Sequence, residues 1–557
     1  MTRKSPASRG YAFTLALAVL GTALLGGLFG PKLFGSPTAD EVDDRMREYT
    51  DLLEAAAYWA PEVIERDDLV YSSIEGMIRR LDPHSTFLRP RDYAEMQDRQ
   101  RGSFYGLGIL VTKRNNQVTV ITPLEGTPAS RLGIRAGDII AEVEGEPTED
   151  LSLDEVVGRL KGPKGTPVNI KIKRVGIEEL IPMTIVRDAI PTNSISYALM
   201  IAADVGYIRI KDFTRTTARE FDQAIAKLEG EGMKKLVLDL RSNPGGLLDA
   251  AVDISDHFIE KDGMIVYTKG RTPDSFQEFR APGTHRNLEV PLVVLINRGS
   301  ASASEIVAGA VQDHDRGLVV GTTSWGKGLV QSVYTLQYNA GLALTTSKYY
   351  TPSGRNIQRD YTSVYDYYVA DQQGPDEPEL EGREIFTTDI GRTVYGGGGI
   401  TPDFVVEPRD LARTLQVLEA RSTIFNFGVE YYAGHPDVSH ELVVTPVLVE
   451  EFIAYADAKD IVEPEEVREA IADPADLDWL ERALKAEIIA AKYGFDASYP
   501  VRLRGDDQVA KALALLPEAE KLAAKAERQR AETIARGGQG DRDDSTSRTS
   551  SDLADPQ

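Results

Sequence analysis

The spacing of apolar residues changes three times along this chain, and the changes divide it into regions of different expected secondary structure. Residues 46–56 repeat apolar side chains every three to four positions, which is typical of an amphipathic helix. Residues 117–122 form a short β-branched run, and glycine and proline punctuate the sequence around it. Farther on, strand-like residues 205–210 and helical residues 217–228 alternate, which predicts a layered α/β domain. From about residue 411 helical spacing dominates again.

These changes predict a multidomain α/β protein, and a chain of 557 residues is long enough for several domains. The last residues are rich in serine, aspartate and arginine and lack apolar anchors, which indicates disorder. We expect six regions in chain order: a signal sequence or membrane anchor (1–30), a helical N-terminal region (40–100), a small β-domain (104–188), a layered α/β domain (190–410), a helical C-terminal region (411–536) and a disordered tail (538–557).

The N-terminal segment has the pattern of an export signal. Arg3, Lys4 and Arg9 precede twenty uncharged residues, 11–30, and a helix of that length spans about 30 Å. No clear cleavage site precedes Pro31, which favours a retained anchor, although a buried helix of a soluble protein is the alternative. The upstream basic residues predict that everything after residue 30 lies outside the cytoplasm. We therefore expect a protein of the cell envelope, on its periplasmic or extracytoplasmic side and attached to the inner membrane or exported.

Composition excludes several classes of site. Asp plus Glu number 87 and Lys plus Arg 63, so the formal net charge is −24 and nucleic acid is not an expected partner. The chain has no cysteine, which rules out disulfides, thiolate zinc sites and cysteine nucleophiles. Its six histidines are scattered and no HExxH motif occurs. We expect no metal and no cofactor.

A glycine-rich string begins the β-domain. Gly106-Leu107-Gly108-Ile109 is followed by a loop and strand at 126–140, a helical segment and a closing strand. This order resembles a PDZ domain in the circularly permuted arrangement common in bacterial proteases. The resemblance implies that a peptide adds a strand to the sheet edge while the N–H groups of Leu107, Gly108 and Ile109 bind its terminal carboxylate. The side chains of Leu107 and Ile109 are expected to line the pocket for its last residue; the alternative is a packing turn.

A candidate nucleophile lies in a small-residue turn after the apolar strand 290–296. Such a turn, leading into a helix, presents a hydroxyl group beside free backbone N–H groups. Ser300, Ser302 and Ser304 are all candidates at this point. Ser302 and Glu305 also have the spacing of a helix-capping box, which requires no catalysis. The spacing leaves both interpretations open.

A candidate base for this serine is Lys327. It lies inside an apolar, glycine-rich stretch, and burial there lowers the pKa of an amine and makes it a usable base for a serine hydroxyl. A Ser–Lys pair can do the work that Ser–His–Asp does elsewhere. The alternative is a phosphate-binding loop, since Gly321-x₄-Gly326-Lys327 fits that motif. Gly328, however, stands where the motif needs Ser or Thr, and a strand rather than a helix is expected next.

A third candidate segment, residues 239–246, directly follows the predicted strand 235–240. It ends in Gly245 and Gly246, and paired glycines can direct their N–H groups toward a developing oxyanion. An ordinary strand-to-helix turn is the alternative.

Taken together, these segments resemble the carboxyl-terminal processing proteases, also called tail-specific proteases. The matching strings follow the family's order: 82–88, the PDZ segment, 239–246, 299–306, 326–331, 349–354 and 399–403. The resemblance implies a layered α/β protease core and a serine endopeptidase activity of the cell envelope. Its substrates are expected to be proteins with exposed apolar C-termini captured by the PDZ domain. The competing hypothesis is a non-catalytic PDZ scaffold on an inactive protease-like fold.

The resemblance also assigns roles. It makes Ser302 the nucleophile, Lys327 the base and Gln331 the residue that orients the lysine. Its oxyanion donors correspond to a glycine of the Gly245–Gly246 pair and to the N–H of Ala303. Lys327 and Gln331 would lie about 13 Å apart on a straight strand, so their contact requires a bend. Gly326 and Gly328 permit one.

Two regions depart from shorter family members, the acidic insertion 361–384 and the helices beyond residue 411. They are candidates for assembly or for binding an adaptor protein. The long amphipathic stretches at 40–100 and after 411 need partners for their apolar faces, which favours a homo-oligomer.

Overall fold

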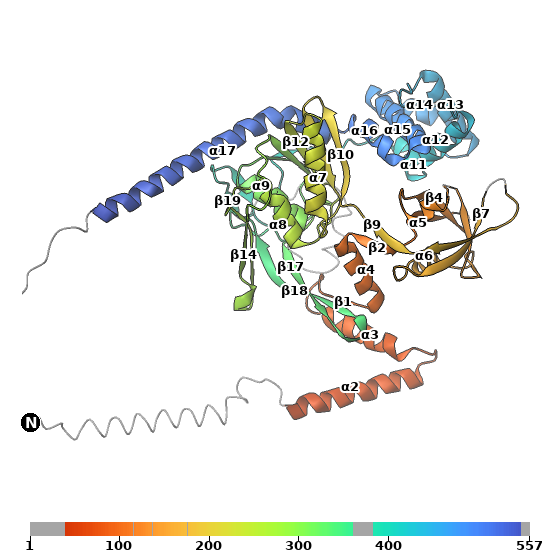
Figure 1. Cartoon of the computed structure of the whole chain (residues 1–557), viewed down its shortest axis with the longest axis horizontal. Coiled ribbons are helices and arrows are strands. Elements are labelled where there is room, and N and C mark those ends of the chain that lie inside the picture. Colours follow the sequence, from red (N-terminus) through yellow and green to blue (C-terminus); the bar gives the residue numbers. More distant parts are fainter. Residues whose placement is uncertain (1–38, 115, 136, 175–176, 360–381, 547–557) are drawn as a thin grey trace, which may run out of the picture. The chain divides into compact units, whose positions relative to one another are not determined.

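The computed structural model describes residues 39–114, 116–135, 137–174, 177–359 and 382–546 (Figure 1). The chain divides into two compact units, Met1–Arg89 and Pro90–Gln557. The predicted signal or anchor at 1–30, most of the acidic insertion and residues 547–557 lie outside the described residues. Within the described ranges, every helix is too short or too polar to cross a membrane.

The first unit contains the helices α2 (Ala39–Trp59) and α3 (Arg66–Ile78) and the short strand β1 (Thr86–Leu88). A turn follows α3, because the carboxylate of Asp82 accepts the backbone N–H groups of His84 and Ser85, both at 2.7 Å. The apolar side chains of α2 are largely exposed. This exposed apolar surface of α2 agrees with the amphipathic pattern of the sequence.

In the second unit, helix α4 (Pro90–Arg101) leads into a small antiparallel β-domain. Its sheet order is β3-β4-β5-β7-β8, with β6 beside β5, and β2 pairs with β9 where the chain enters and leaves. Alternate residues of β7 are fully buried, as the sequence pattern predicts, and α5 and α6 complete the domain. The elements are β2 (Ser103–Gly106), β3 (Ile109–Arg114), β4 (Gln117–Pro123), α5 (Pro128–Arg131), β5 (Ile139–Val143), β6 (Glu146–Pro147), α6 (Leu153–Leu160), β7 (Pro167–Lys173), β8 (Ile181–Val186) and β9 (Asp188–Pro191).

A six-stranded sheet forms the centre of the next domain, in the order β10-β11-β12-β15-β16-β21. All neighbouring strands are parallel except β10, which runs antiparallel to β11 at one edge. The strands are β10 (Ile195–Ala202), β11 (Val205–Ile210), β12 (Lys235–Asp239), β15 (Leu292–Ile296), β16 (Leu318–Gly321) and β21 (Phe404–Val405).

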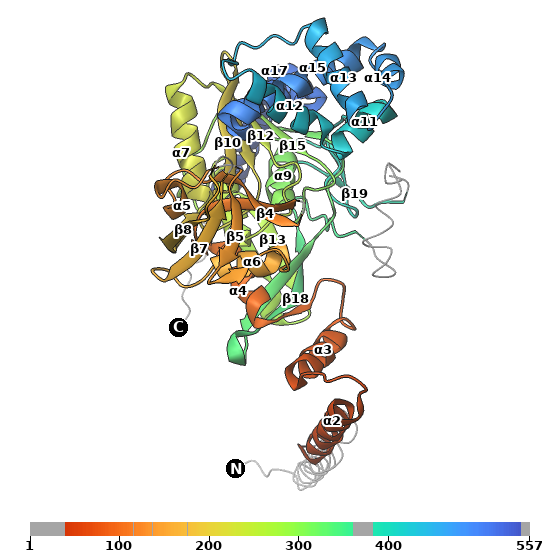
Figure 2. The same ribbon diagram turned by 90° about the vertical axis from the view of Figure 1, so that its right-hand side faces the viewer.

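Each face of this sheet is covered by helices, which explains why its strands are continuous apolar runs. Leu236 and Leu238 pack on one side against α7 (Thr217–Gly230), α8 (Leu248–Asp256) and α9 (Ala303–Asp313). Val237, between them, packs on the other side against α16 (Phe495–Leu503) and α17 (Asp507–Thr546) (Figures 1 and 2). The domain is therefore a layered α/β sandwich, as predicted, but its second helical layer comes from the far C-terminal part of the chain.

A second, smaller sheet lies beside the sandwich. Strand β18 pairs antiparallel with both β13 and β17, and β14 pairs with β13. Strands β19 and β20 form a separate hairpin. The elements are β13 (Met264–Gly270), η1 (Pro273–Ser275), β14 (Gln277–Arg280), β17 (Leu329–Thr335), η2 (Gln337–Asn339), β18 (Gly341–Tyr350), β19 (Ile385–Thr387) and β20 (Thr393–Tyr395).

The helices of the C-terminal region pack into two different cores. Helices α11 (Arg413–Ala420), α12 (Thr423–Gly434), α13 (Pro446–Ala458), α14 (Pro464–Ala470) and α15 (Pro474–Tyr493) enclose a core of their own. Helices α16 and α17 instead join the sandwich. Helix α17 ends at Thr546, so it covers the first residues of the segment 538–557 that was predicted to be disordered. Each residue added to an existing helix gains one backbone hydrogen bond, so a helix can extend into a segment of polar composition. A prediction from composition alone does not include this effect.

Candidate active site

The candidate site lies where three neighbouring parallel strands end. Asp239 at the end of β12 is paired with Leu295 of β15, and Ile296 is paired with Gly321 of β16. The carboxyl ends of parallel strands meet at one sheet edge, where open α/β sheets bind their ligands. The loops that leave these strands carry the residues that the sequence singled out.

Ser302 begins α9 in an unusual backbone conformation. Its φ of 54° and ψ of −111° lie in a region that residues with a side chain seldom adopt. The conformation is held from two sides: the Ser302 N–H donates to Glu305 Oε2 at 2.7 Å, and the Tyr349 hydroxyl donates to the Ser302 carbonyl at 3.1 Å. The strain fixes the direction in which the Ser302 side chain leaves the backbone.

The structure gives the three candidate serines different environments. Ser300 Oγ donates to the carbonyl of Leu240 at 2.8 Å, and Ser304 Oγ donates to the carbonyl of Asn243 at 3.0 Å. Both are fully buried, and their hydroxyl groups join the serine turn to the loop after β12. Ser302 alone of the three lines the cleft described below.

The fully buried carboxylate of Glu305 organises the loops around Ser302. Its Oε1 accepts the Ser324 hydroxyl at 2.5 Å and the Gly326 N–H at 2.7 Å. Its Oε2 accepts the N–H groups of Ser302 at 2.7 Å and of Lys327 at 2.9 Å. Burial raises the pKa of Glu305, and these four donors oppose the rise. The sequence argument treated Glu305 only as half of a capping box; its contact with the lysine loop was not foreseen.

Lys327 lies in the loop before β17, and its Nζ donates to Gln331 Oε1 at 3.3 Å. The contact that the resemblance required is therefore present. A register irregularity between Val330 and Gln331 bends β17 where it pairs with β18. Burial lowers the pKa of Lys327, although attraction to Glu305 partly offsets the effect.

Across the described ranges, no hydrogen bond joins Lys327 Nζ to Ser302 Oγ, and Lys327 forms no salt bridge. Catalytic hydrogen bonds are often long in ligand-free sites and tighten when substrate binds.

The glycines beside Lys327 let its loop pass close to other backbone segments. Gly326 has φ of +88°, and a Cβ there would lie 2.8 Å from the nitrogen of Gly399. A Cβ on Gly328 would lie 2.8 Å from the nitrogen of Gln358. No helix follows this loop; β17 does, so the phosphate-loop alternative loses the helix N-terminus it needs.

Of the three expected oxyanion residues, two keep a free donor. The N–H of Gly245 donates to Asn243 Oδ1 at 2.8 Å, so it is occupied, contrary to the role expected for it. The N–H groups of Gly246 and Ala303 have no acceptor among the described residues. Gly245 serves instead as a spacer, because a Cβ there would lie 2.8 Å from the Cβ of Ser302.

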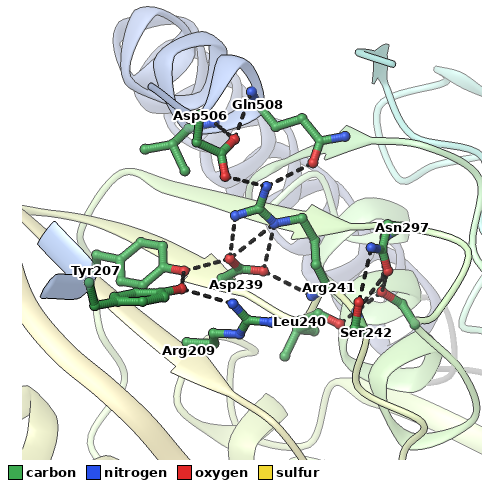
Figure 3. A network of polar contacts seen from close by, with 12 residues as sticks. Tyr207, Arg209, Asp239, Leu240, Arg241, Ser242, Asn297, Asp506 and Gln508 are labelled. Carbon is green, nitrogen blue, oxygen red and sulfur yellow. Dashed lines mark hydrogen bonds and ion pairs between the residues drawn. The ribbon is translucent and has the colours of Figure 1, made fainter. Parts of the chain in front are cut away.

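A polar network anchors the first residues of the loop 239–246, which carries Gly245 and Gly246 (Figure 3). The guanidinium of Arg241 contacts Asp239 at 2.6 Å and Asp506 at 2.7 Å, and it donates to Gln508 Oε1 at 2.8 Å. The Tyr207 hydroxyl donates to Asp239 at 2.5 Å. The start of α17 thus anchors the loop that carries Gly246. Nothing in the sequence spacing signals this link.

The site residues line one cleft of about 430 Å³. All six peptidase-site residues expected from the sequence line it, namely Gly245, Gly246, Ser302, Ala303, Lys327 and Gln331. Much of the remaining wall is apolar and consists of Met96, Phe213, Leu247, Leu248, Ile306, Leu329, Val330, Val333 and Ala343. A hydroxyl, an amine of lowered pKa and two free N–H donors in one apolar cleft are the groups that acyl transfer needs.

The expected peptide-binding residues are only partly placed as predicted. Strand β3, which Ile109 begins, lies at the edge of its sheet, so an added strand has an edge to pair with. Leu107, however, is only 2% exposed and belongs to the domain core, so its side chain does not line an open pocket. Gly108 has φ of +77°, and a Cβ there would lie 2.3 Å from the Cβ of Thr127.

Comparison with known proteins identifies the family. Residues 204–365 match peptidase family S41, and residues 119–174 match the PDZ domain. The chain is 41% identical over 318 residues to a carboxy-terminal-processing protease of Bartonella bacilliformis, which covers 56% of this chain and 73% of the relative. It is 32% identical over 349 residues to the carboxy-terminal processing protease CtpA of Bacillus subtilis, covering 62% and 72%.

Among solved structures, the photosystem II D1 C-terminal processing protease is 29% identical, covers 63% of this chain and 85% of its own, and gives a TM-score of 0.34. The chain belongs to the carboxyl-terminal processing proteases of peptidase family S41. It is a serine-type peptidase with a PDZ domain.

Proposed function

We propose that this protein is an endopeptidase that captures exposed apolar C-terminal tails with its PDZ domain and cuts peptide bonds with a Ser302–Lys327 dyad. The observation that carries the proposal is the carboxylate of Glu305, which binds the backbone N–H groups of both dyad residues. It brings the lysine loop to the serine turn without pairing with the amine itself.

In the proposed reaction, the neutral amine of Lys327 accepts the proton of Ser302 as Oγ attacks the scissile carbonyl carbon. The N–H groups of Gly246 and Ala303 bind the oxyanion of the tetrahedral intermediate, each worth about 3–4 kcal/mol in comparable sites. The protonated Lys327 then gives its proton to the leaving amine. Water attacks the acyl-enzyme with Lys327 again as base, and Ser302 is released. Gln331 keeps the lysine Nζ oriented.

Substrate recognition has two parts in this proposal. A C-terminal tail pairs with the edge strand β3, where backbone hydrogen bonds supply affinity. The apolar wall of the cleft then receives apolar side chains near the scissile bond. Both surfaces favour extended, unfolded substrate segments, because a strand must be free to pair.

The proposed location is the extracytoplasmic side of the cell envelope. Its support is the basic and apolar pattern of residues 1–30. Fusing a reporter enzyme that is active only outside the cytoplasm to the C-terminus tests it; reporter activity is expected, and its absence contradicts the location.

The activity is tested with the full chain and its Ser302→Ala variant. Each is incubated with an unstructured protein that ends in apolar residues, and with the same protein ending in charged residues. Mass spectrometry is expected to find internal cleavage products only with wild type and mainly from the apolar tail. Equal products from both enzymes would refute the nucleophile assignment, and binding without cleavage by wild type would favour a scaffold.

A further inference from the structure

Two of the scattered histidines meet a carboxylate outside the active site. Asp222 lies on α7, His257 follows α8 directly, and His285 lies in the loop after β14. His257 Nε2 is 2.8 Å from Asp222 Oδ1, and His285 Nδ1 is 3.5 Å from Asp222 Oδ2. One ligand atom from each residue lies within 4.8 Å of the other two. A small movement of the side chains would bring all three ligand atoms around one ion.

The contacts of His257 are compatible with those of a metal ligand. Its Nδ1 lies 3.0 Å from the carbonyl of Asp253, to which it can only donate. In the neutral ring, Nε2 then carries a lone pair, yet it faces a carboxylate oxygen of Asp222. Either a proton on Nε2 or a cation bound by both atoms removes this repulsion. Metal-binding histidines commonly donate their other ring N–H to a carbonyl, which fixes the tautomer.

The third ligand is held in place by a buried carboxylate. Asp256, which is 1% exposed, accepts the backbone N–H groups of Gly283 at 2.7 Å and of Thr284 and His285 at 2.9 Å. The ring of His285 stacks on that of His257, with centroids 4.4 Å apart. The histidine pair is therefore organised by the fold, and its geometry does not depend on a flexible loop.

We propose that Asp222, His257 and His285 bind a late first-row divalent ion such as Zn²⁺. Two imidazoles and one carboxylate are ligands that zinc and its neighbours accept, whereas Mg²⁺ and Ca²⁺ prefer all-oxygen sites. The Asp222 side chain is 52% exposed, which leaves room for water to complete the coordination. The ion joins α7 to α8, and α8 begins just after the Gly245–Gly246 pair. This site takes no part in the proposed peptide hydrolysis.

The test is metal binding by the full chain after treatment with a chelator. Zn²⁺ is titrated in competition with a chromophoric chelator, and the thermal unfolding midpoint is measured with and without the ion. Wild type is expected to bind one equivalent and to unfold at a higher temperature when it is loaded. The variants Asp222→Asn and His285→Gln remove ligands from two separate elements, neither of them deeply buried. Each is expected to weaken binding by at least about tenfold and to lose the thermal shift.

The matched control is His435→Gln, an exposed histidine directly after helix α12 and outside the proposed site, which should bind like wild type. Circular dichroism of the metal-free variants checks that they fold. Cobalt substitution gives a second readout, because Co²⁺ at a site of nitrogen and oxygen ligands absorbs in the visible range. Wild type that binds no stoichiometric ion, or ligand variants that bind as tightly as wild type, would overturn the site.

Discussion

The backbone N–H groups of Ser302 and Lys327 donate to the same oxygen atom of Glu305, at 2.7 and 2.9 Å. The two residues belong to loops that leave different strands, β15 and β16, so no local rule brings them together. The shared acceptor sets the separation of the two backbones. The side chains alone then decide whether hydroxyl and amine meet.

Replacing Glu305 with Gln should therefore impair both folding and catalysis. The amide nitrogen cannot accept, so the two donors that meet the oxygen it replaces lose their partner, at about 1–3 kcal/mol each. We expect a lower unfolding free energy in urea and a strong fall in kcat. Ser324→Ala is the control, because it removes a donor to Oε1 but leaves the contacts of Ser302 and Lys327 intact. An equal loss of kcat in both variants would contradict a positioning role for Glu305.

The proposed base gives the pH profile a definite direction. Burial lowers the pKa of Lys327, and only its neutral form accepts the serine proton. As pH falls through that lowered pKa, the amine becomes protonated and kcat/KM should decline. As pH rises through it, kcat/KM should increase and then level off. The measurement is kcat/KM from pH 5 to 9 on a peptide without titrating side chains; a flat profile would argue against Lys327 as the base.

Lys327→Arg should be inactive, since arginine keeps its charge and cannot act as a base. Lys327→Ala should also be inactive, because it leaves no amine to accept the serine proton. Both variants should still bind an apolar C-terminal peptide with the affinity of wild type, which fluorescence anisotropy can measure. Cleavage by the arginine variant at a wild-type rate would remove the lysine from the mechanism.

In the PDZ domain, Gly108→Ala should weaken binding of C-terminal peptides by more than about tenfold, equivalent to 1.4 kcal/mol. The new Cβ would have to fit 2.3 Å from Thr127 Cβ in a backbone of positive φ, so the loop before β3 must move. Gly126→Ala is the matched control, because that glycine also has positive φ but has open space around it. Similar affinities of the two variants would mean that this loop does not bind the tail.

Because α17 packs on the sheet, a substitution on this helix should lower the unfolding free energy of the protein even though it lies far along the chain from the sheet strands. Leu516 is 2% exposed, and its truncation to Ala should cost about 2–5 kcal/mol in unfolding free energy. Lys521→Ala, at an exposed position of the same helix, should change that free energy by less than about 0.5 kcal/mol. Urea denaturation followed by circular dichroism measures both. A small effect at Leu516 would indicate that α17 is not part of the folded sandwich.

The most accurate predictions from the sequence concern secondary structure that local residue patterns determine. The strand before Ser302, the helix after it and strand β17 follow from apolar spacing and glycine positions. Features that depend on distant contacts were not visible. The irregularity at Val330 and Gln331 arises from pairing with β18, and the engaged N–H of Gly245 depends on the side chain of Asn243.

Two further features escaped the sequence argument for the same reason. The helical pattern after residue 411 is the same whether a helix joins a separate bundle, as α15 does, or returns to the sheet, as α17 does. Histidines 257 and 285 are separated in the chain and meet only because α8 and the loop after β14 lie side by side. Burial of Leu107 likewise depends on which way its turn faces the domain core.

The position of α17 has a consequence for how the molecule is made. The ribosome synthesises all six strands of the sandwich before it reaches Asp506, Gln508 and the helix that seals their second face. A nascent chain therefore exposes an apolar face of the sheet and an unsupported Gly246 loop until α17 has been synthesised. We therefore expect peptidase activity only after α17 has packed on the sheet.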